Sequence, residues 1–303
     1  MRKIIEKSLL KLVGSTNILA DLAKLPSSEL NSFLLELFHL KSQKINPVDL
    51  VKKFDNNRFV VPNDVDLIQL KTLEIECLKY AKEHEFEPVT LSPLTPLGTC
   101  SIVAKVHQNK VVSSLRGTEV VADATNVLAL KIASEFKESG NKNSILRYAT
   151  THQHVRAQQF PNPDYSAHFT VLCLTSGGFD RGNFSFELDQ LEAHLRLLYE
   201  LIQQKFPSYP IRIKFFAKKN TEPFRRLIQQ KEQAIWLDKS IVWINDFDNE
   251  YYQNIQFKIG IQKQDQWIEL ADGGDVNWTQ KLLGNQKHRL FISGIGLEFL
   301  DKL

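Results

Sequence analysis

Polar and apolar residues alternate along two neighbouring stretches near the middle of this 303-residue chain, and the pattern predicts a β-hairpin. The second stretch runs from Ala167 to Leu174 and is mostly apolar, while Pro161 and Pro163 mark the turn between the two. In the first stretch, four polar residues share one face: His152, His154, Arg156 and Gln158. An arginine fixed on a strand suits bidentate binding of phosphate or carboxylate. The alternative is an amphipathic hairpin whose polar face is solvated.

The chain before this hairpin divides at Pro62-Asn63-Asp64, which we expect to separate a helical region, 1–62, from a larger domain, 63–303. The first fourteen residues predict an amphipathic helix and lack the features of a signal peptide. Capping signals predict further helices that begin at Ser27 and at Asn46-Pro47.

Strands and helices mix in the larger domain. Helical spacing falls on 65–84, 123–137, 186–205, 223–233, 279–283 and 296–303. Strand patterns fall on 86–91, on a hairpin of 100–107 with 110–115, and on 211–217, 236–245, 254–262, 266–271 and 289–293. Several of these strands are joined as hairpins. The prediction is therefore an α+β fold, with a mostly antiparallel β-sheet flanked by helices.

Composition narrows the class of protein without naming a function. The formal net charge is +3, and no concentrated basic stripe of the kind that nucleic-acid readers carry is visible. The sequence contains no run of about 18 apolar residues, so it predicts no membrane span. The three cysteines include no CxxC pair, which favours a reducing cytoplasm over a disulfide framework or a zinc knuckle. No P-loop, HExxH motif or Ser-His-Asp arrangement supports a hydrolase or NTPase.

The order of the segments resembles the catalytic domain of class II aminoacyl-tRNA synthetases, within them the histidyl-tRNA synthetase-like branch. The helix 65–84 followed by Phe86–Pro93 is similar to the first motif, used in dimerisation. The segment Ser114–Glu119, with Ala124-Thr125-Asn126 downstream, is similar to the branch's Leu-Arg-Pro-Glu segment and its helix-opening threonine. On this resemblance Arg116 and Glu119 are expected catalytic residues.

The second motif of the family is an Arg-x-Glu strand, a loop and a strand with a phenylalanine. Arg156 matches the arginine that holds the ATP α-phosphate, Gln158 stands where glutamate is usual, and Phe169 matches the ring under adenine. The third motif, a Gly-x-Gly turn followed by Glu-Arg, is similar to Gly294–Phe299. The resemblance therefore implies that Arg156 and Gln158 are catalytic and that Arg156, Phe169, Gly294, Gly296 and Glu298 bind a nucleotide.

Two further segments of the branch are echoed without their arginines. Of the branch's Arg-Gly-x-Asp-Tyr-Tyr segment, this sequence keeps only the tyrosine pair, Tyr251 and Tyr252, and has Phe247 at the arginine position. The branch's Gly-Gly-Arg-Tyr-Asp segment is similar to Gly273, Gly274 and Asp275, again without the arginine. These five residues are expected to bind a ligand, with Asp272 and Asp275 as candidates for its amine; a glycine turn with acidic flanks is the alternative.

The missing arginines, together with Phe299 in the third motif, predict that histidine adenylation is lost or strongly reduced, because charge that builds up on phosphate needs preorganised cations. The resemblance then implies a paralogue that binds an amino-acid-like or nucleotide ligand as a regulatory or partner subunit, as the histidyl-tRNA synthetase-like regulatory subunit of ATP phosphoribosyltransferase does. The alternatives are an ATP-dependent ligase of altered substrate, with ATP and Mg as cofactors, and a tRNA-charging enzyme. A homodimer follows from the family; a tRNA or protein partner stays open.

His152, His154 and His168 could bind a metal, but local hydrogen bonding is favoured, so no metal is expected.

Overall fold

A computed structural model describes residues 17–141, 143–158, 166–218, 221–235, 240–244 and 250–302. The chain is built around one eight-stranded sheet in the order β1-β4-β5-β10-β9-β8-β6-β7. Neighbouring strands are antiparallel except at the two edges, where β1 pairs with β4 and β6 with β7 in parallel. The bounds are β1 Glu87–Pro88, β4 Leu146–Val155, β5 His168–Phe179, β6 Ile211–Ala217, β7 Ser240–Ile244, β8 Ile255–Lys263, β9 Gln266–Val276 and β10 His288–Gly296. The predicted α+β architecture is confirmed.

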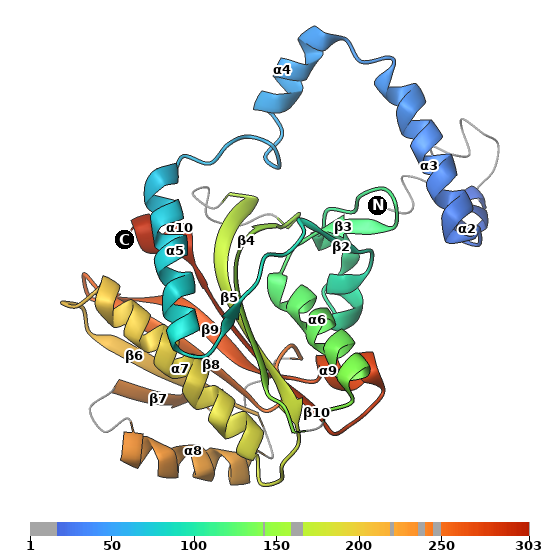
Figure 1. Cartoon of the computed structure of the whole chain (residues 1–303). Helices are drawn as coiled ribbons and strands as arrows, with labels where there is room; N and C mark the ends of the chain where they lie inside the picture. The colour runs from blue at the N-terminus through green and yellow to red at the C-terminus, as the bar shows by residue number, and fades with distance from the viewer. Residues whose placement is uncertain are drawn as a thin grey trace.

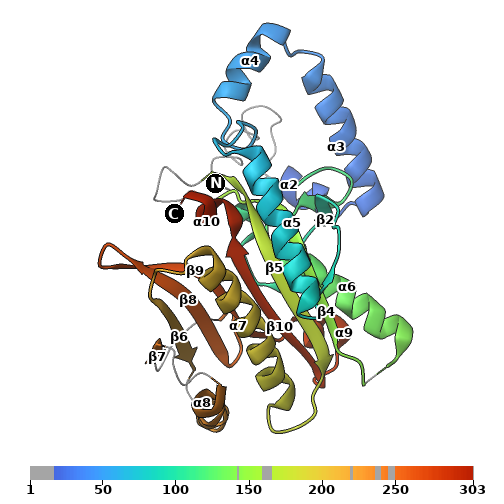
Figure 2. The ribbon, with the colours of Figure 1, turned by 60° about the vertical axis from the view of Figure 1, so that its left-hand side comes forward.

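Helices cover both faces of this sheet (Figures 1 and 2). On one face lie α5 (Leu67–Glu83) and α7 (Ser185–Lys205), and on the other α6 (Ala124–Ser139) and α9 (Trp278–Leu283). The helix α8 (Glu222–Ile235) packs beside α7, and α10 (Leu297–Lys302) follows β10 directly. None of the helices in the described ranges is both long and apolar enough to cross a membrane.

Alternation along β4 assigns its side chains to the two layers. Arg147 bonds to Gln190 of α7, and Thr151 bonds to Glu74 of α5. Tyr148, one residue out of phase, bonds to Glu135 of α6, and His154 accepts a hydrogen bond from the first residue of α6. The predicted shared face of His152, His154 and Arg156 therefore points to the α6 layer, where the candidate site lies.

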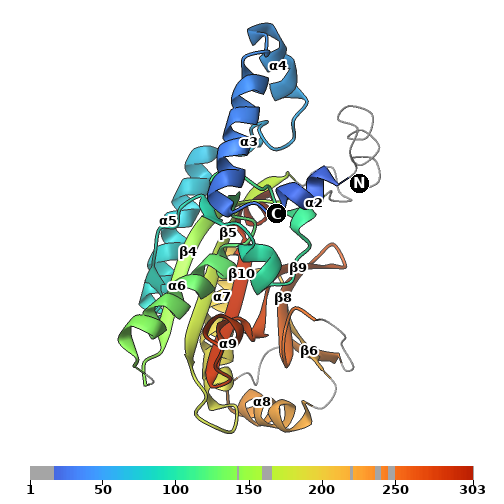
Figure 3. The ribbon, with the colours of Figure 1, turned by 90° about the vertical axis from the view of Figure 1, so that its right-hand side faces the viewer.

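The N-terminal helices extend away from the sheet (Figures 1 and 3). They are α2 (Ile18–Leu22), α3 (Ser27–Ser42) and α4 (Pro47–Asp55), and none of their residues is buried. Asn46 caps α4 as predicted, by accepting from the Val48 N–H. Ser27 is instead the first residue of α3, after Pro26, which has no side-chain cap bond. The helix predicted for the first fourteen residues lies outside the described residues, as does the turn at Pro161–Asp164.

The hairpin predicted for 100–107 with 110–115 is wrong. A π-helical turn, η1 (Thr99–Val103), and a 3-10 turn, η2 (Gln108–Lys110), occupy this segment. A two-stranded sheet pairs β2 (Leu94–Pro96) with β3 (Thr118–Val120). The physical reason is Glu119, whose buried carboxylate accepts from the N–H groups of Gly98 and Cys100 and from the Gln108 amide. A buried carboxylate needs several donors, and the chain curls around it to supply them.

Candidate functional site

A cavity of about 210 Å³ opens on the α6 side of the sheet, where β4, β5, β9 and β10 meet the N-terminus of α6. Seven of the residues predicted from sequence to bind a ligand or nucleotide line it: Arg156, Phe169, Tyr251, Tyr252, Asp272, Gly294 and Gly296. The other polar residues of its lining are Asp123, Thr125, His154, Cys173 and Ser293. Segments far apart in the sequence thus meet at one place, as the order of motifs led us to expect.

Arg156 is held in place by its neighbours. Its Nε donates to the Ala122 carbonyl at 3.0 Å, and its guanidinium lies 5.2 Å from the centroid of the Phe169 ring. One terminal nitrogen is 3.9 Å from the Asp123 carboxylate. The side chain remains about one-third exposed (35%). A guanidinium that is oriented but still accessible can pair with an anionic group of a ligand.

Asp123 joins the start of α6 to the cavity. Its Oδ1 accepts from the backbone N–H of Thr125 at 3.0 Å and from the Thr125 hydroxyl at 2.7 Å, and Tyr251 donates to its Oδ2 at 3.1 Å. Burial opposes ionisation, but the charge of Arg156 and the Thr125 hydrogen bonds outweigh it and lower the pKa of the carboxyl. Asp123 is therefore a carboxylate at neutral pH.

Asp272 supplies a second acid to the cavity lining. Its Oδ2 accepts from the Tyr252 hydroxyl at 3.2 Å and from the Gln256 amide at 3.3 Å. Burial raises the pKa of this carboxyl, and the hydrogen bond from Tyr252 only partly offsets it. Gly274 allows this wall to form, because a Cβ there would lie 2.2 Å from the Ile255 carbonyl oxygen and 2.6 Å from the Tyr252 ring.

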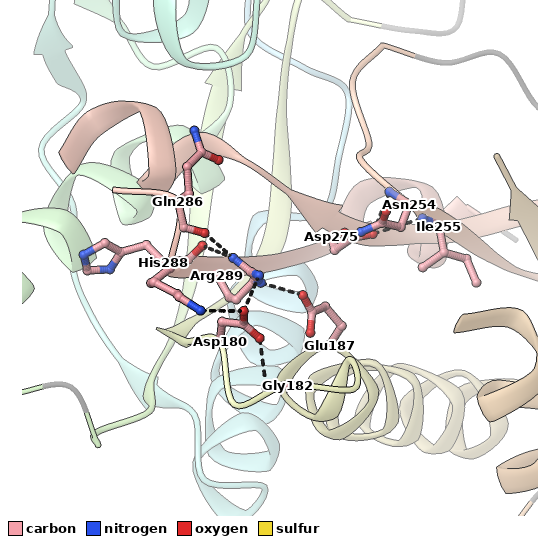
Figure 4. Close-up of polar contacts among 10 residues, drawn as sticks. Asp180, Gly182, Glu187, Asn254, Ile255, Asp275, Gln286, His288 and Arg289 are labelled. Carbon is pink, nitrogen blue, oxygen red and sulfur yellow. Dashed lines mark hydrogen bonds and ion pairs between the residues drawn. The ribbon is translucent and has the colours of Figure 1, made fainter. Parts of the chain in front are cut away.

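Gly273 and Asp275 face the other side of β9. Asp275 is buried and accepts from the backbone N–H groups of Asn254 and Ile255 at 3.1 and 3.0 Å, as Figure 4 shows. Its side chain does not line the cavity. A Cβ on Gly273 would lie 2.5 Å from the Ser293 Cβ and 2.7 Å from the Phe257 ring, so this glycine serves the packing of β9 against both β10 and β8. Of the two acids considered for a ligand amine, Asp272 is the one that faces the cavity.

Four more predicted residues lie outside the cavity lining. Arg116 is exposed on a turn with φ 65°, and Glu119 is buried in its own hydrogen-bond network. The carbonyl of Gln158 accepts from Arg58. Glu298 accepts from Asn63, at 3.0 Å, and from Thr170, so it ties β5 to the segment before α5. Glu119 and Glu298 therefore hold neighbouring segments together through hydrogen bonds.

Sequence analysis missed Asp123 and Thr125 as site residues. Both open α6, and both line the cavity. The signal was present, because Asp123 begins the predicted helix 123–137 and Thr125 lies in the segment that is similar to the branch's helix-opening threonine. Arg116 and Glu119 were expected from the resemblance of Ser114–Glu119 to another segment of the branch, and neither lines the cavity.

The three histidines of the hairpin do not converge. His154 is buried in the cavity wall, whereas His168 lies on the opposite face of the hairpin, where its Nε2 bonds to the Val61 carbonyl at 2.8 Å. Burial, together with the nearby Arg156 charge, lowers the pKa of His154 to about 3. His154 is therefore a neutral imidazole over the physiological pH range.

Comparisons with known proteins match this geometry at the level of the fold. No family model and no curated protein sequence matches the chain. Among solved structures, apo histidyl-tRNA synthetase from S. aureus aligns at 11% identity and a TM-score of 0.58, covering 77% of this chain and 65% of that one. An ATP phosphoribosyltransferase regulatory subunit/histidyl-tRNA synthetase from Bacillus halodurans C aligns at 12% and 0.57, covering 80% and 81%. A histidine–tRNA ligase subunit from Alicyclobacillus acidocaldarius aligns at 11% and 0.57, covering 81% and 95%.

These likenesses show that the chain has the fold of the class II aminoacyl-tRNA synthetase catalytic domain, as the motifs had indicated. The chain spans 65% of the length of the S. aureus synthetase. Phe299, which the sequence comparison predicts to stand where the third motif has arginine, packs against the main core. Phe247, predicted to stand at another of the missing arginines, lies outside the described residues.

Proposed function

We propose that this chain binds a small amino-acid-like or nucleotide ligand in the cavity and acts as a regulatory or partner subunit, without efficient adenylate synthesis. The observation that carries the proposal is the charge of the cavity lining. Within the described residues that form it, Arg156 is the only lysine or arginine, and the same lining contains two acids, Asp123 and Asp272. A zwitterion suits such a lining better than a triphosphate does, because its carboxylate can pair with Arg156 and its amine with an aspartate.

Adenylation makes different demands on a site. Charge develops on the α-phosphate and on the leaving pyrophosphate, and preorganised cations must stabilise it. Arg156 over Phe169 is compatible with one such contact, but Phe299 cannot supply a second. Removing one stabilising donor from a transition state typically costs about 10²–10³ in rate. We therefore expect weak or absent turnover, even if a nucleotide enters the cavity.

A partner role draws support from two further observations. One structural neighbour carries the name of a regulatory subunit of ATP phosphoribosyltransferase. The N-terminal helices expose large apolar side chains, among them Phe38 and Val51 at 58% and 65%. Apolar side chains on a projecting element are common in protein interfaces. A protein partner, or a second copy of this chain as in the family's dimers, is the proposed occupant.

The alternative is an ATP-dependent aminoacyl or acyl ligase of altered substrate, using ATP with Mg. It is favoured by one observation: Arg156 and Phe169, the residues similar to those of the second motif, both line the cavity, with the guanidinium 5.2 Å from the ring centroid. A tRNA-charging role is a weaker alternative, which tRNA retention in filter binding at low salt would support.

The test combines binding and turnover on the full chain. Thermal unfolding is measured with each of the twenty amino acids, AMP and ATP with Mg, because a ligand of the native state must raise the unfolding temperature. We expect at least one amino acid to stabilise the wild type and to lose its effect in Arg156→Gln. Arg181→Gln, which removes an exposed pair with Asp189, is the matched control and should keep the effect.

Turnover separates the proposal from its alternative. Pyrophosphate exchange with ATP in the presence of each amino acid should stay at background. Robust exchange with any of them would replace the proposal by the ligase function. Absence of stabilisation by every compound would remove the amino-acid-like or nucleotide ligand itself.

A further inference from the structure

Three side chains of the cavity form a compact group of metal-ligating atoms. Asp123, His154 and Cys173 each offer one ligand atom, and these atoms all lie within 4.8 Å of one another. They come from the cap of α6 and from the paired strands β4 and β5. His154 Nε2 and Cys173 Sγ are 3.7 Å apart. Bond lengths of about 2.3 Å to sulfur and about 2.0 Å to nitrogen separate two ligands of a tetrahedral ion by about 3.5 Å, slightly less than this distance.

The hydrogen bonds around His154 fix the form of the ring that binds metals. The backbone N–H of Ala124 donates to Nε2 at 3.0 Å, so the proton of the neutral imidazole sits on Nδ1 and the lone pair is on Nε2. Nε2 is also the nitrogen beside Cys173. A metal would replace the Ala124 donor at Nε2. Burial raises the pKa of the Cys173 thiol well above its usual value, so the thiolate would form only with the bound ion, where the backbone N–H groups of Ala124 and Thr125 would also stabilise it.

The carboxylate is oriented by a surrounding shell. The backbone N–H and the hydroxyl of Thr125 donate hydrogen bonds to Oδ1 of Asp123, and the Tyr251 hydroxyl donates one to Oδ2. Carboxylate ligands of metals are typically fixed in this way by outer hydrogen bonds. The charges also balance, because Asp123 and a Cys173 thiolate would neutralise a divalent ion. Arg156, which lies 3.9 Å from Asp123, would then be left to face Asp272 and the ligand.

We propose that Asp123, His154 and Cys173 bind one divalent transition-metal ion of the zinc type. One carboxylate oxygen, one imidazole nitrogen and one thiolate suit zinc, and three protein ligands leave a fourth position open. All three residues line the cavity, so the open position faces a bound ligand. The ion supplies the cavity with a second positive centre beside Arg156, able to coordinate a carboxylate or an amine. The site does not depend on the proposed function, since metal binding needs no organic ligand.

Cobalt titration of the full chain tests the proposal. Protein stripped with a chelator under reducing conditions is titrated with Co²⁺, whose thiolate complexes show a sulfur-to-cobalt charge-transfer band. We expect one cobalt per chain with this band, its loss in Cys173→Ser, and its displacement by Zn²⁺. Cys77→Ser is the matched control and should keep the band, because Cys77 is a buried cysteine of α5 in the main core.

Two more measurements keep the test decisive if Cys173→Ser fails to fold. Asp123→Asn retains a residue that caps helices well but removes the charge, and it should weaken cobalt binding at least about tenfold. X-ray absorption of the zinc-loaded wild type should show one sulfur, with nitrogen or oxygen completing the shell. The proposal is overturned by a wild type without the charge-transfer band, by a band that survives Cys173→Ser, or by a shell with no sulfur or with two.

Discussion

At the scale of single residues, the cavity combines groups whose ionisation is shifted in opposite directions. Asp123 is ionised because Arg156 and Thr125 outweigh its burial, whereas burial prevails at Asp272 and raises its pKa. A carboxyl whose folded-state pKa is raised stabilises the fold only while it is protonated. That contribution is present below the unfolded pKa, about 3.9, and is lost as the pH rises through the folded-state pKa.

Asp272→Asn should therefore make the free protein more stable at neutral pH, by roughly 0.5–2 kcal/mol. Asparagine keeps an oxygen for the Tyr252 hydroxyl and carries no charge into the cavity wall. The advantage should shrink as the pH approaches 4, where the wild-type carboxyl is protonated in the folded state. Urea unfolding at pH 4, 5.5 and 7 measures it, with the exposed Asp189→Asn as control. A difference that is independent of pH would contradict the assignment of a raised pKa.

At the scale of elements, β10 and α7 are joined by one arginine. Arg289 on β10 pairs with Asp180 after β5, at 2.9 Å, and with Glu187 in the first turn of α7, at 2.8 Å (Figure 4). Glu187 is buried, which raises its pKa despite the nearby guanidinium. A buried carboxylate deprived of its cation is strongly destabilising, whereas replacing the whole pair is not. This link orients α7 on the sheet and lies outside the cavity lining.

Arg289→Met should lower the free energy of unfolding by about 3–5 kcal/mol, because it leaves Glu187 buried without a cation. Adding Glu187→Leu should recover much of that loss, so the two changes together cost less than their sum. Denaturant unfolding of the two single variants and the double variant gives the coupling. Arg181→Met, at an exposed ion pair, should change stability by no more than about 0.5 kcal/mol. If the stability changes of the two single variants simply add in the double variant, the ion pair between Arg289 and Glu187 does not couple β10 to α7.

Two of the predicted glycines differ in what they allow between strands. A Cβ at 274 would lie 2.2 Å from the Ile255 carbonyl oxygen, so Gly274→Ala must displace β8 or the Tyr252 ring and should cost about 1–3 kcal/mol. A Cβ at 296 meets its nearest neighbour, Phe299, at an ordinary 3.9 Å, so Gly296→Ala should cost far less. Thermal unfolding of both variants compares them. Equal losses would mean that the close approach at 274 relaxes without cost.

At the scale of the whole molecule, the sequence predicted the long elements and the meeting of the motifs better than it predicted the short irregular segments. α6, α7 and β6 appear within two residues of their predicted bounds, because periodic apolar residues bury a face over many turns. The hairpin predicted for 100–107 with 110–115 is wrong, since the shape of this segment depends on the buried Glu119 and on hydrogen-bond donors from η1 and η2. Asp272 and Asp275 look equivalent in sequence, and only the register of β9 assigns one to the cavity and the other to the core.

The division at residue 62 leads to the last prediction, that residues 63–303 fold without the N-terminal helices. No residue of α2, α3 or α4 is buried, and within residues 17–62, the part of this segment that the structure describes, polar contacts join it to the rest of the chain. These include Arg58 with the carbonyls of Ala157 and Gln158, Asn31 with the Gly117 N–H, and the Val61 carbonyl with His168. Each contact of this kind contributes about 1 kcal/mol or less.

A chain of residues 63–303 should therefore unfold cooperatively, within about 3 kcal/mol of the full chain, and should keep any thermal stabilisation by amino acids. A chain of residues 85–303 is the matched control and should fail to fold, because it also lacks α5, which buries Leu70, Leu73, Cys77 and Ala81 in the main core. Circular dichroism and urea unfolding compare the three chains. If 63–303 shows no cooperative transition, the projecting helices belong to the folding unit, and their exposed apolar side chains must be explained within it rather than by a partner.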